Sequence, residues 1–90
     1  MDKIFEVIDK TGRVIYLPKE RWIHIVTKHK YLGNDFEHIK ETVCQPLFLN
    51  TDLMHEEVKY YHRWYKELGK YLVVVVKYLN GEGFIISSFY

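Results

Sequence analysis

Apolar and polar residues alternate in two short segments near the start of the chain, "KIFEVID" and "RVIYL". A period of two is typical of β-strands, and Gly12 between the two segments is a residue that favours a turn. The pattern therefore predicts a β-hairpin over residues 3–17.

From Pro18 onward, the spacing of apolar residues changes from every second position to the three- and four-residue spacing of a helix. Pro18 suits the first turn of a helix, where its missing N–H is not needed, and Glu20 suits the positive end of the helix dipole. Trp22 and Ile25 lie on the apolar stripe of this helix. We predict that it runs to about His29 or Lys30.

A second helix is predicted from its capping pattern. Asn34 is a favourable N-cap, and Glu37 three positions later completes a capping box. Apolar residues at positions 36, 39 and 43 form the stripe that would face the core, and Pro46 stops the helix.

Four further segments are rich in strand-forming residues: 47–51, 58–65, 70–79 and 83–90. Asn80 and Gly81 between the last two indicate a tight hairpin. The "YLVVVV" segment lacks alternation, so we expect a central strand that is buried on both faces. The order of elements predicts an α+β fold, with the N-terminal hairpin and two helices packed on a largely antiparallel, four-stranded sheet centred on "YLVVVV".

Composition narrows the class of protein. Ninety residues suit one domain, residues 1–90, and 48% hydrophobic and 17% aromatic residues exclude disorder. The single Cys44 excludes a disulfide framework and a cysteine-rich zinc site. Neither a signal-peptide pattern nor an apolar run of membrane-spanning length is present, so we expect a soluble, cytoplasmic protein with no membrane partner. A net charge of +1 is low for a protein whose affinity for nucleic acid comes mainly from phosphate contacts.

Two histidines, His24 and His29, fall on the first predicted helix. A separation of five positions places the two imidazole rings about 140° apart around the helix. They therefore cannot share a face or bind the same metal ion. His29 falls on the apolar stripe with Trp22, whereas His24 lies on a basic face. The basic residues of that face, Arg21 and Lys28, are predicted to bind RNA. The other histidines do not converge with His24 or His29 at a metal-binding spacing, so no metal site is predicted.

The "KYYHRWY" segment places Lys59, Tyr61, Arg63 and Tyr65 on one side of a strand. Two cations that alternate with two phenols could bind RNA, through phosphate contacts and stacking on unpaired bases. The same pattern also suits a solvated strand face with cross-strand tyrosine packing.

Lys77 ends the run of four valines, where an ammonium group could stabilise charge on a phosphorane or could simply mark the end of the buried segment. If the Asn-Gly turn has two residues, Lys77 pairs with Phe84, and Ser88 and Tyr90 share its face. A three-residue loop would bring Ser87 to that face instead.

These residue types suit one reaction in particular. No acyl-transfer pattern, glycine-rich phosphate loop or metal-binding carboxylate cluster is present. Cleavage of RNA by its own 2′-hydroxyl needs only a proton acceptor, a proton donor and a cation, and no cofactor. The alternative is a binding module for RNA or for a protein, without catalysis.

The motifs "RWIHIVTKH", "YYHRWY", "YLVVVVKY" and "GFIISSFY", in this order, resemble the small phage and bacterial nucleases of the barnase–EndoU–colicin–RelE (BECR) fold. The resemblance covers residues 13 to 90, and it implies a metal-independent endoribonuclease, often a toxin or conflict-system effector that has an antitoxin or immunity partner. It implies five catalytic residues: His24, His29, Lys77, Ser87 and Tyr90. This sequence departs from the family pattern at Ser87, where threonine is usual, and at Ser88, where alanine is frequent. Of the two histidines, His29 would transfer the proton and His24 would position phosphate.

Overall fold

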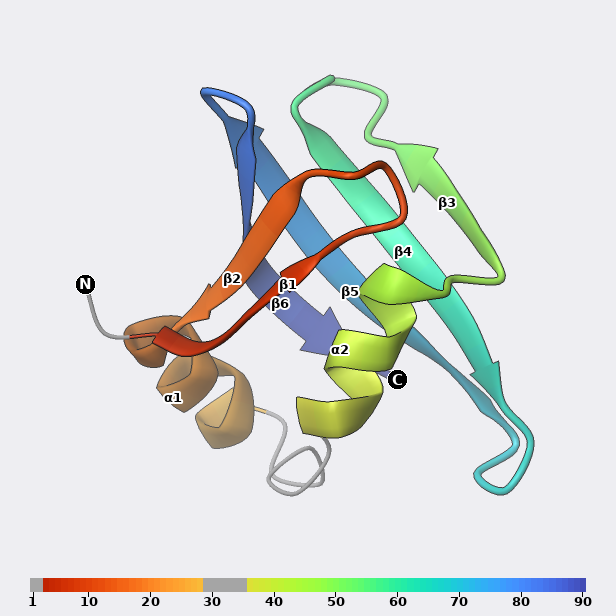
Figure 1. The fold of residues 1–90 in the computed structure, drawn as a ribbon. Helices are drawn as coiled ribbons and strands as arrows, with labels where there is room; N and C mark the ends of the chain where they lie inside the picture. Colours follow the sequence, from red (N-terminus) through yellow and green to blue (C-terminus); the bar gives the residue numbers. More distant parts are fainter. Residues whose placement is uncertain (1–2, 29–35) are drawn as a thin grey trace.

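A computed structural model describes residues 3–28 and 36–90 of the chain (Figure 1). Its elements are β1 (Lys3–Ile8), β2 (Val14–Pro18), α1 (Lys19–Lys28), α2 (Phe36–Cys44), β3 (Phe48–Thr51), β4 (Val58–Tyr65), β5 (Lys70–Leu79) and β6 (Glu82–Phe89). The predicted α+β class is confirmed, and each predicted helix and strand is present within a few residues of its expected bounds. The predicted cap at Asn34 lies outside the described residues.

The strands form one six-stranded sheet in the order β1-β2-β6-β5-β4-β3 (Figure 1). β5 lies between β6 and β4, and its residues Val74, Val75 and Val76 are buried, as the unbroken valine run predicts. The expectation of a separate hairpin on a four-stranded sheet is wrong. β2 joins the sheet by pairing in parallel with β6, where Ile15 lies opposite Gly83.

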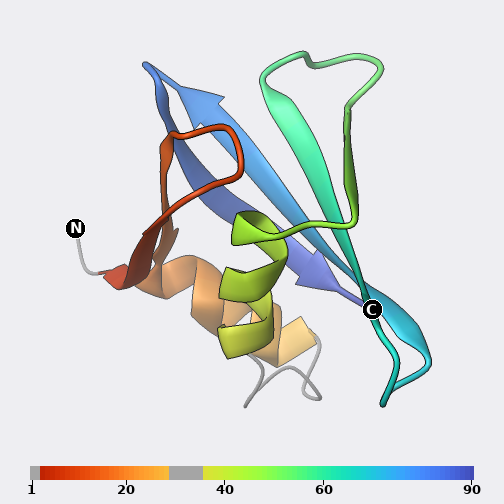
Figure 2. The ribbon, with the colours of Figure 1, turned by 45° about the vertical axis from the view of Figure 1, so that its right-hand side comes forward.

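Both helices cover the same face of the sheet (Figures 1 and 2). Ile25 of α1 and Ile39 of α2 are buried in the core, which also contains alternate residues of β5, including Leu72 and Val74. Trp22 packs against this core from α1, so the predicted contacts of Trp22 and Ile25 are confirmed. The opposite face of the sheet, on which the other residues of β5 lie, is called the open face below.

The last hairpin has the two-residue turn that the sequence predicts. Asn80 and Gly81 both have a positive φ, and Lys77 pairs with Phe84. A β-bulge then shifts the register, since Val76 pairs with Ile85 but Val75 pairs with Ser87. Ser87 therefore shares the open face with Lys77.

The bulge sends Ser88 to the opposite face. Ser88 is buried beneath the helices, and its hydroxyl donates a hydrogen bond to the carbonyl of Val73 at 3.0 Å. The expectation that a two-residue turn places Ser88 and Tyr90 on the face of Lys77 is wrong, because it assumes a strand without a bulge.

Close packing around Gly83 leads to a stability prediction. A Cβ atom at this position would lie 2.8 Å from Tyr78, 2.9 Å from Val76 and 3.0 Å from Ile15. We expect Gly83→Ala to lower the free energy of unfolding by about 1–3 kcal/mol, as overpacking does in other cores. Urea unfolding measures this, with Glu82→Ala at the exposed neighbouring position as the control. Equal stability of the two variants would contradict this close packing around Gly83.

Candidate functional site

The side of β4 that carries Lys59, Tyr61, Arg63 and Tyr65 faces the helices rather than solvent. Tyr61 pairs with Val74, on the side of β5 that faces the core, and Tyr61 and Tyr65 are only 0% and 5% exposed. The prediction that these two phenols stack on RNA bases is therefore wrong. Both sides of β4 are aromatic, so the pattern could not indicate which side the helices cover. Lys59 reaches sideways to β3, where its ammonium donates to Thr51 Oγ1 at 2.9 Å.

The predicted catalytic residues do not form one cluster among the described residues. Lys77 and Ser87 are partly buried on the open face, whereas Tyr90 packs against the core on the helix side. His24 is exposed on α1, and His29 lies outside the described residues.

The basic residues beside His24 are also exposed. Arg21 and Lys28 both lie at the surface of α1. Arg21 lines a shallow hollow together with Tyr16 and Phe84, two rings that stack at 6.1 Å. Phe84 is the partner of Lys77 in the hairpin, so Arg21 approaches the open face at that point.

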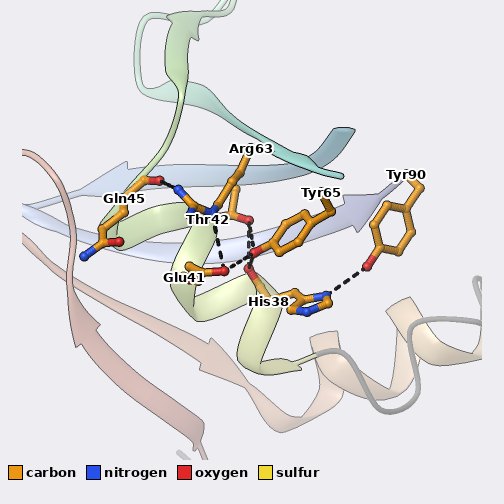
Figure 3. Close-up of polar contacts among 7 residues, drawn as sticks. All are labelled: His38, Glu41, Thr42, Gln45, Arg63, Tyr65 and Tyr90. Atoms are coloured by element: carbon orange, nitrogen blue, oxygen red, sulfur yellow. Dashed lines mark hydrogen bonds and ion pairs between the residues drawn. The ribbon is translucent and has the colours of Figure 1, made fainter. Parts of the chain in front are cut away.

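A different set of polar side chains converges where α2 packs against the end of β4 (Figure 3). We call it the α2–β4 cluster. Its members are the histidine and glutamate of α2, the two residues of β4 beneath them, and the tyrosine that follows β6: His38, Glu41, Arg63, Tyr65 and Tyr90.

The spacing of residues on α2 explains why its polar side chains meet there. Ile39 and Val43 form the stripe that enters the core. His38, Glu41 and Gln45 follow at intervals of three and four, so they lie within about 60° of one another on a different side of the helix. His38 and Glu41 are not among the site residues predicted from the sequence, although the His-x-x-Glu spacing on a predicted helix places both on one side of it.

Tyr65 is the centre of the α2–β4 cluster. Its hydroxyl donates to Glu41 Oε1 at 2.8 Å and also lies 3.1 Å from the carbonyl of His38. Burial, together with the hydrogen bond to Glu41, raises the pKa of Tyr65 to about 12, and burial is the larger cause. The phenol therefore stays protonated at neutral pH and holds the carboxylate in place.

The imidazole of His38 is held from two sides. Its ring stacks on the ring of Tyr65, with the centroids 4.2 Å apart. Nδ1 lies 3.3 Å from the hydroxyl of Tyr90 (Figure 3). The imidazole of His38 and the carboxylate of Glu41 thus both contact the phenol of Tyr65. The contact with Tyr90 uses Nδ1 of His38, and Nε2 lies on the other side of the ring.

Arg63 supplies the cation of the cluster. Its Nη1 donates to the carbonyl of Gln45 at 2.6 Å, a favourable contact at the C-terminal end of a helix. Its Nε lies 3.3 Å from Glu41 Oε1 as an ion pair. Within the described part of the chain, this buried Nε has no acceptor in hydrogen-bond geometry. Arginine has five N–H donors, so a guanidinium paired with one carboxylate can still donate to a second anion through its other N–H groups.

The cluster therefore brings together a carboxylate, an imidazole and a guanidinium. These are the groups that general acid–base chemistry at a phosphate requires.

No group of three or more histidine, cysteine, aspartate or glutamate side chains converges on a metal position within residues 3–28 and 36–90. In the same two ranges, neither helix is both long and apolar enough to cross a membrane.

Comparisons with protein-family models, with curated proteins and with solved structures found no match for this chain.

Proposed function

We propose that the protein is a metal-independent endoribonuclease whose active site is the α2–β4 cluster. The observation that supports this most is the convergence of Glu41, His38 and Arg63 around a single protonated phenol. This proposal keeps the reaction predicted from the sequence but assigns it to other residues. A cytoplasmic location and capture by an antitoxin or immunity protein belong to the same proposal.

In the proposed reaction, the carboxylate of Glu41 accepts the proton of the ribose 2′-hydroxyl as the 2′-oxygen attacks phosphorus. The bond from phosphorus to the 5′-oxygen then breaks, and the imidazole of His38 donates a proton from Nε2 to that leaving oxygen. The products are a 2′,3′-cyclic phosphate and a free 5′-hydroxyl. Arg63 balances the charge that develops on the non-bridging oxygens.

Two tyrosines are positioning residues in this scheme. Tyr65 fixes the Glu41 carboxylate, and Tyr90 orients His38 through Nδ1. Tyr90 is thus retained from the residues predicted by sequence, although its role changes from a catalytic to a positioning one.

The test is incubation of the purified protein with single-stranded RNA in EDTA, followed by mapping of the fragment ends. We expect cleavage to survive chelation and to leave 2′,3′-cyclic phosphates, because the attacking oxygen belongs to the substrate. Strands with 2′-deoxyribose at every position should stay intact. Cleavage of DNA, or activity that requires a divalent ion, would overturn the mechanism. RNA that is shifted in a gel but never cut would instead support the binding module.

A further inference from the structure

A hollow lies beside the last residues of β4, at the edge of the sheet. It is lined by one leucine, one arginine and two aromatic residues: Leu47, Arg63, Trp64 and Tyr71. β3 begins at Phe48, opposite His62, so residues 63–65 of β4 extend past the end of β3. For this reason Arg63, from the helix side, and Trp64, from the open face, reach the same space.

Aromatic rings continue from this hollow across the open face. We call Phe48, His62, Trp64 and Tyr71 the aromatic platform. Phe48 stacks on His62 at 4.3 Å and meets the edge of Tyr71 at 6.0 Å. Trp64 and Tyr71 lie 5.0 Å apart at an interplanar angle of 63°. Phe48, Trp64 and Tyr71 remain 48%, 45% and 40% exposed.

The geometry of the platform leaves ring faces available to a flat ligand. Because Trp64 and Tyr71 meet at a steep angle, neither ring covers the other face to face. Burial lowers the pKa of His62 below its ordinary value, so its imidazole is uncharged at neutral pH. The platform is therefore an uncharged aromatic surface that adjoins the guanidinium of Arg63.

We propose that the aromatic platform binds an unpaired nucleobase of single-stranded RNA, next to a phosphate held by Arg63. Arg63 lines the hollow and is also a member of the α2–β4 cluster, so the position of the phosphate in this inference rests on the proposed function. A base and its phosphate need an aromatic face and a cation side by side, and every base has such a face. A purely apolar protein segment would not use the cation.

The test measures binding of a single-stranded 2′-O-methyl oligonucleotide, which cannot be cleaved through the 2′-oxygen. We expect Trp64→Ala and Tyr71→Ala each to raise Kd by about 5- to 150-fold, the range that base–aromatic stacking covers in alanine substitutions. Trp64→Phe should restore most of the affinity, because it keeps an aromatic face. Leu79→Ala is the matched control, since Leu79 lies on the same strand and face as Tyr71 and is 48% exposed.

An oligonucleotide with abasic sugars should bind more weakly to the unchanged protein and should lose nothing further with Trp64→Ala. If Trp64→Ala and Tyr71→Ala bind like Leu79→Ala while natural RNA is still cleaved, the platform proposal fails and the proposed function stands. If the platform variants lose affinity but no RNA is ever cleaved, the proposed function fails and the stacking site stands. Unchanged RNA binding with loss of a protein partner would also overturn the platform proposal.

Discussion

Glu41→Gln is expected to lower the single-turnover rate of RNA cleavage by about 10²- to 10³-fold, within the range usual for removal of a general acid or base. Glutamine has almost the same shape and can still accept the hydrogen bond from Tyr65, but it cannot take up the 2′-proton. The loss should therefore appear in the rate of the chemical step rather than in RNA affinity. Quenched-flow cleavage with excess protein separates the two quantities.

The matched control is Glu37→Gln, which removes a carboxylate from the first turn of the same helix, where it pairs with Lys40 at the surface. We expect this variant to cleave at the unchanged rate. Lys77→Ala distinguishes the α2–β4 cluster from an active site on the open face. It should leave the rate nearly unchanged, whereas a loss with Lys77→Ala and none with Glu41→Gln would locate catalysis on the open face.

The largest expected effect on stability comes from Asp9, which follows β1 and is 5% exposed. Its Oδ1 accepts hydrogen bonds from the backbone N–H groups of Thr11 and Arg13, at 2.8 and 2.9 Å, and from the Thr11 hydroxyl at 2.7 Å. Its Oδ2 accepts from the buried phenols of Tyr61, at 3.0 Å, and Tyr78. One carboxylate thus joins the first hairpin to β4 and β5.

Asp9→Ala should lower the free energy of unfolding by about 2–5 kcal/mol, because it removes the buried carboxylate that accepts from both phenols and from the turn of the first hairpin. Asp52→Ala is the control. Asp52 also accepts a phenol, from Tyr60 at 2.7 Å, but it is partly exposed and water can replace it. We expect it to cost about 1 kcal/mol or less. Urea unfolding of both variants measures the difference, and similar losses would show that burial of the Asp9 network adds nothing.

The same carboxylate gives the stability a pH dependence. Burial alone would raise the pKa of Asp9, but the hydrogen bonds from Tyr78, Thr11, Arg13 and Tyr61 lower it below the ordinary value of 3.8. A carboxyl whose pKa falls on folding contributes stability that is present above 3.8 and is lost as the pH drops through the lower, folded value. The difference in stability between the unchanged protein and Asp9→Ala should therefore shrink below about pH 4.

The elements of this protein follow from its sequence because they depend on local periods and on a few backbone preferences. Alternation predicted the first hairpin, and Pro46 marked the end of α2. The unbroken valines placed β5 inside the sheet, since only a strand buried on both faces can carry such a run. The two-residue turn at Asn80 and Gly81 also follows from the chain itself, because few residues adopt two successive positive φ angles.

Only the tertiary structure decided which faces these elements present. Both sides of β4 carry aromatic rings, so the side that became core depended on where the helices docked, and that choice buried Tyr61 and Tyr65. The bulge between Ile85 and Ser87 reversed the faces of Ser87 and Ser88, and no local residue preference predicts a bulge inside an apolar strand. The meeting of His38 and Glu41 with Arg63 joins residues more than 20 positions apart, and such a contact exists only once α2 packs on β4.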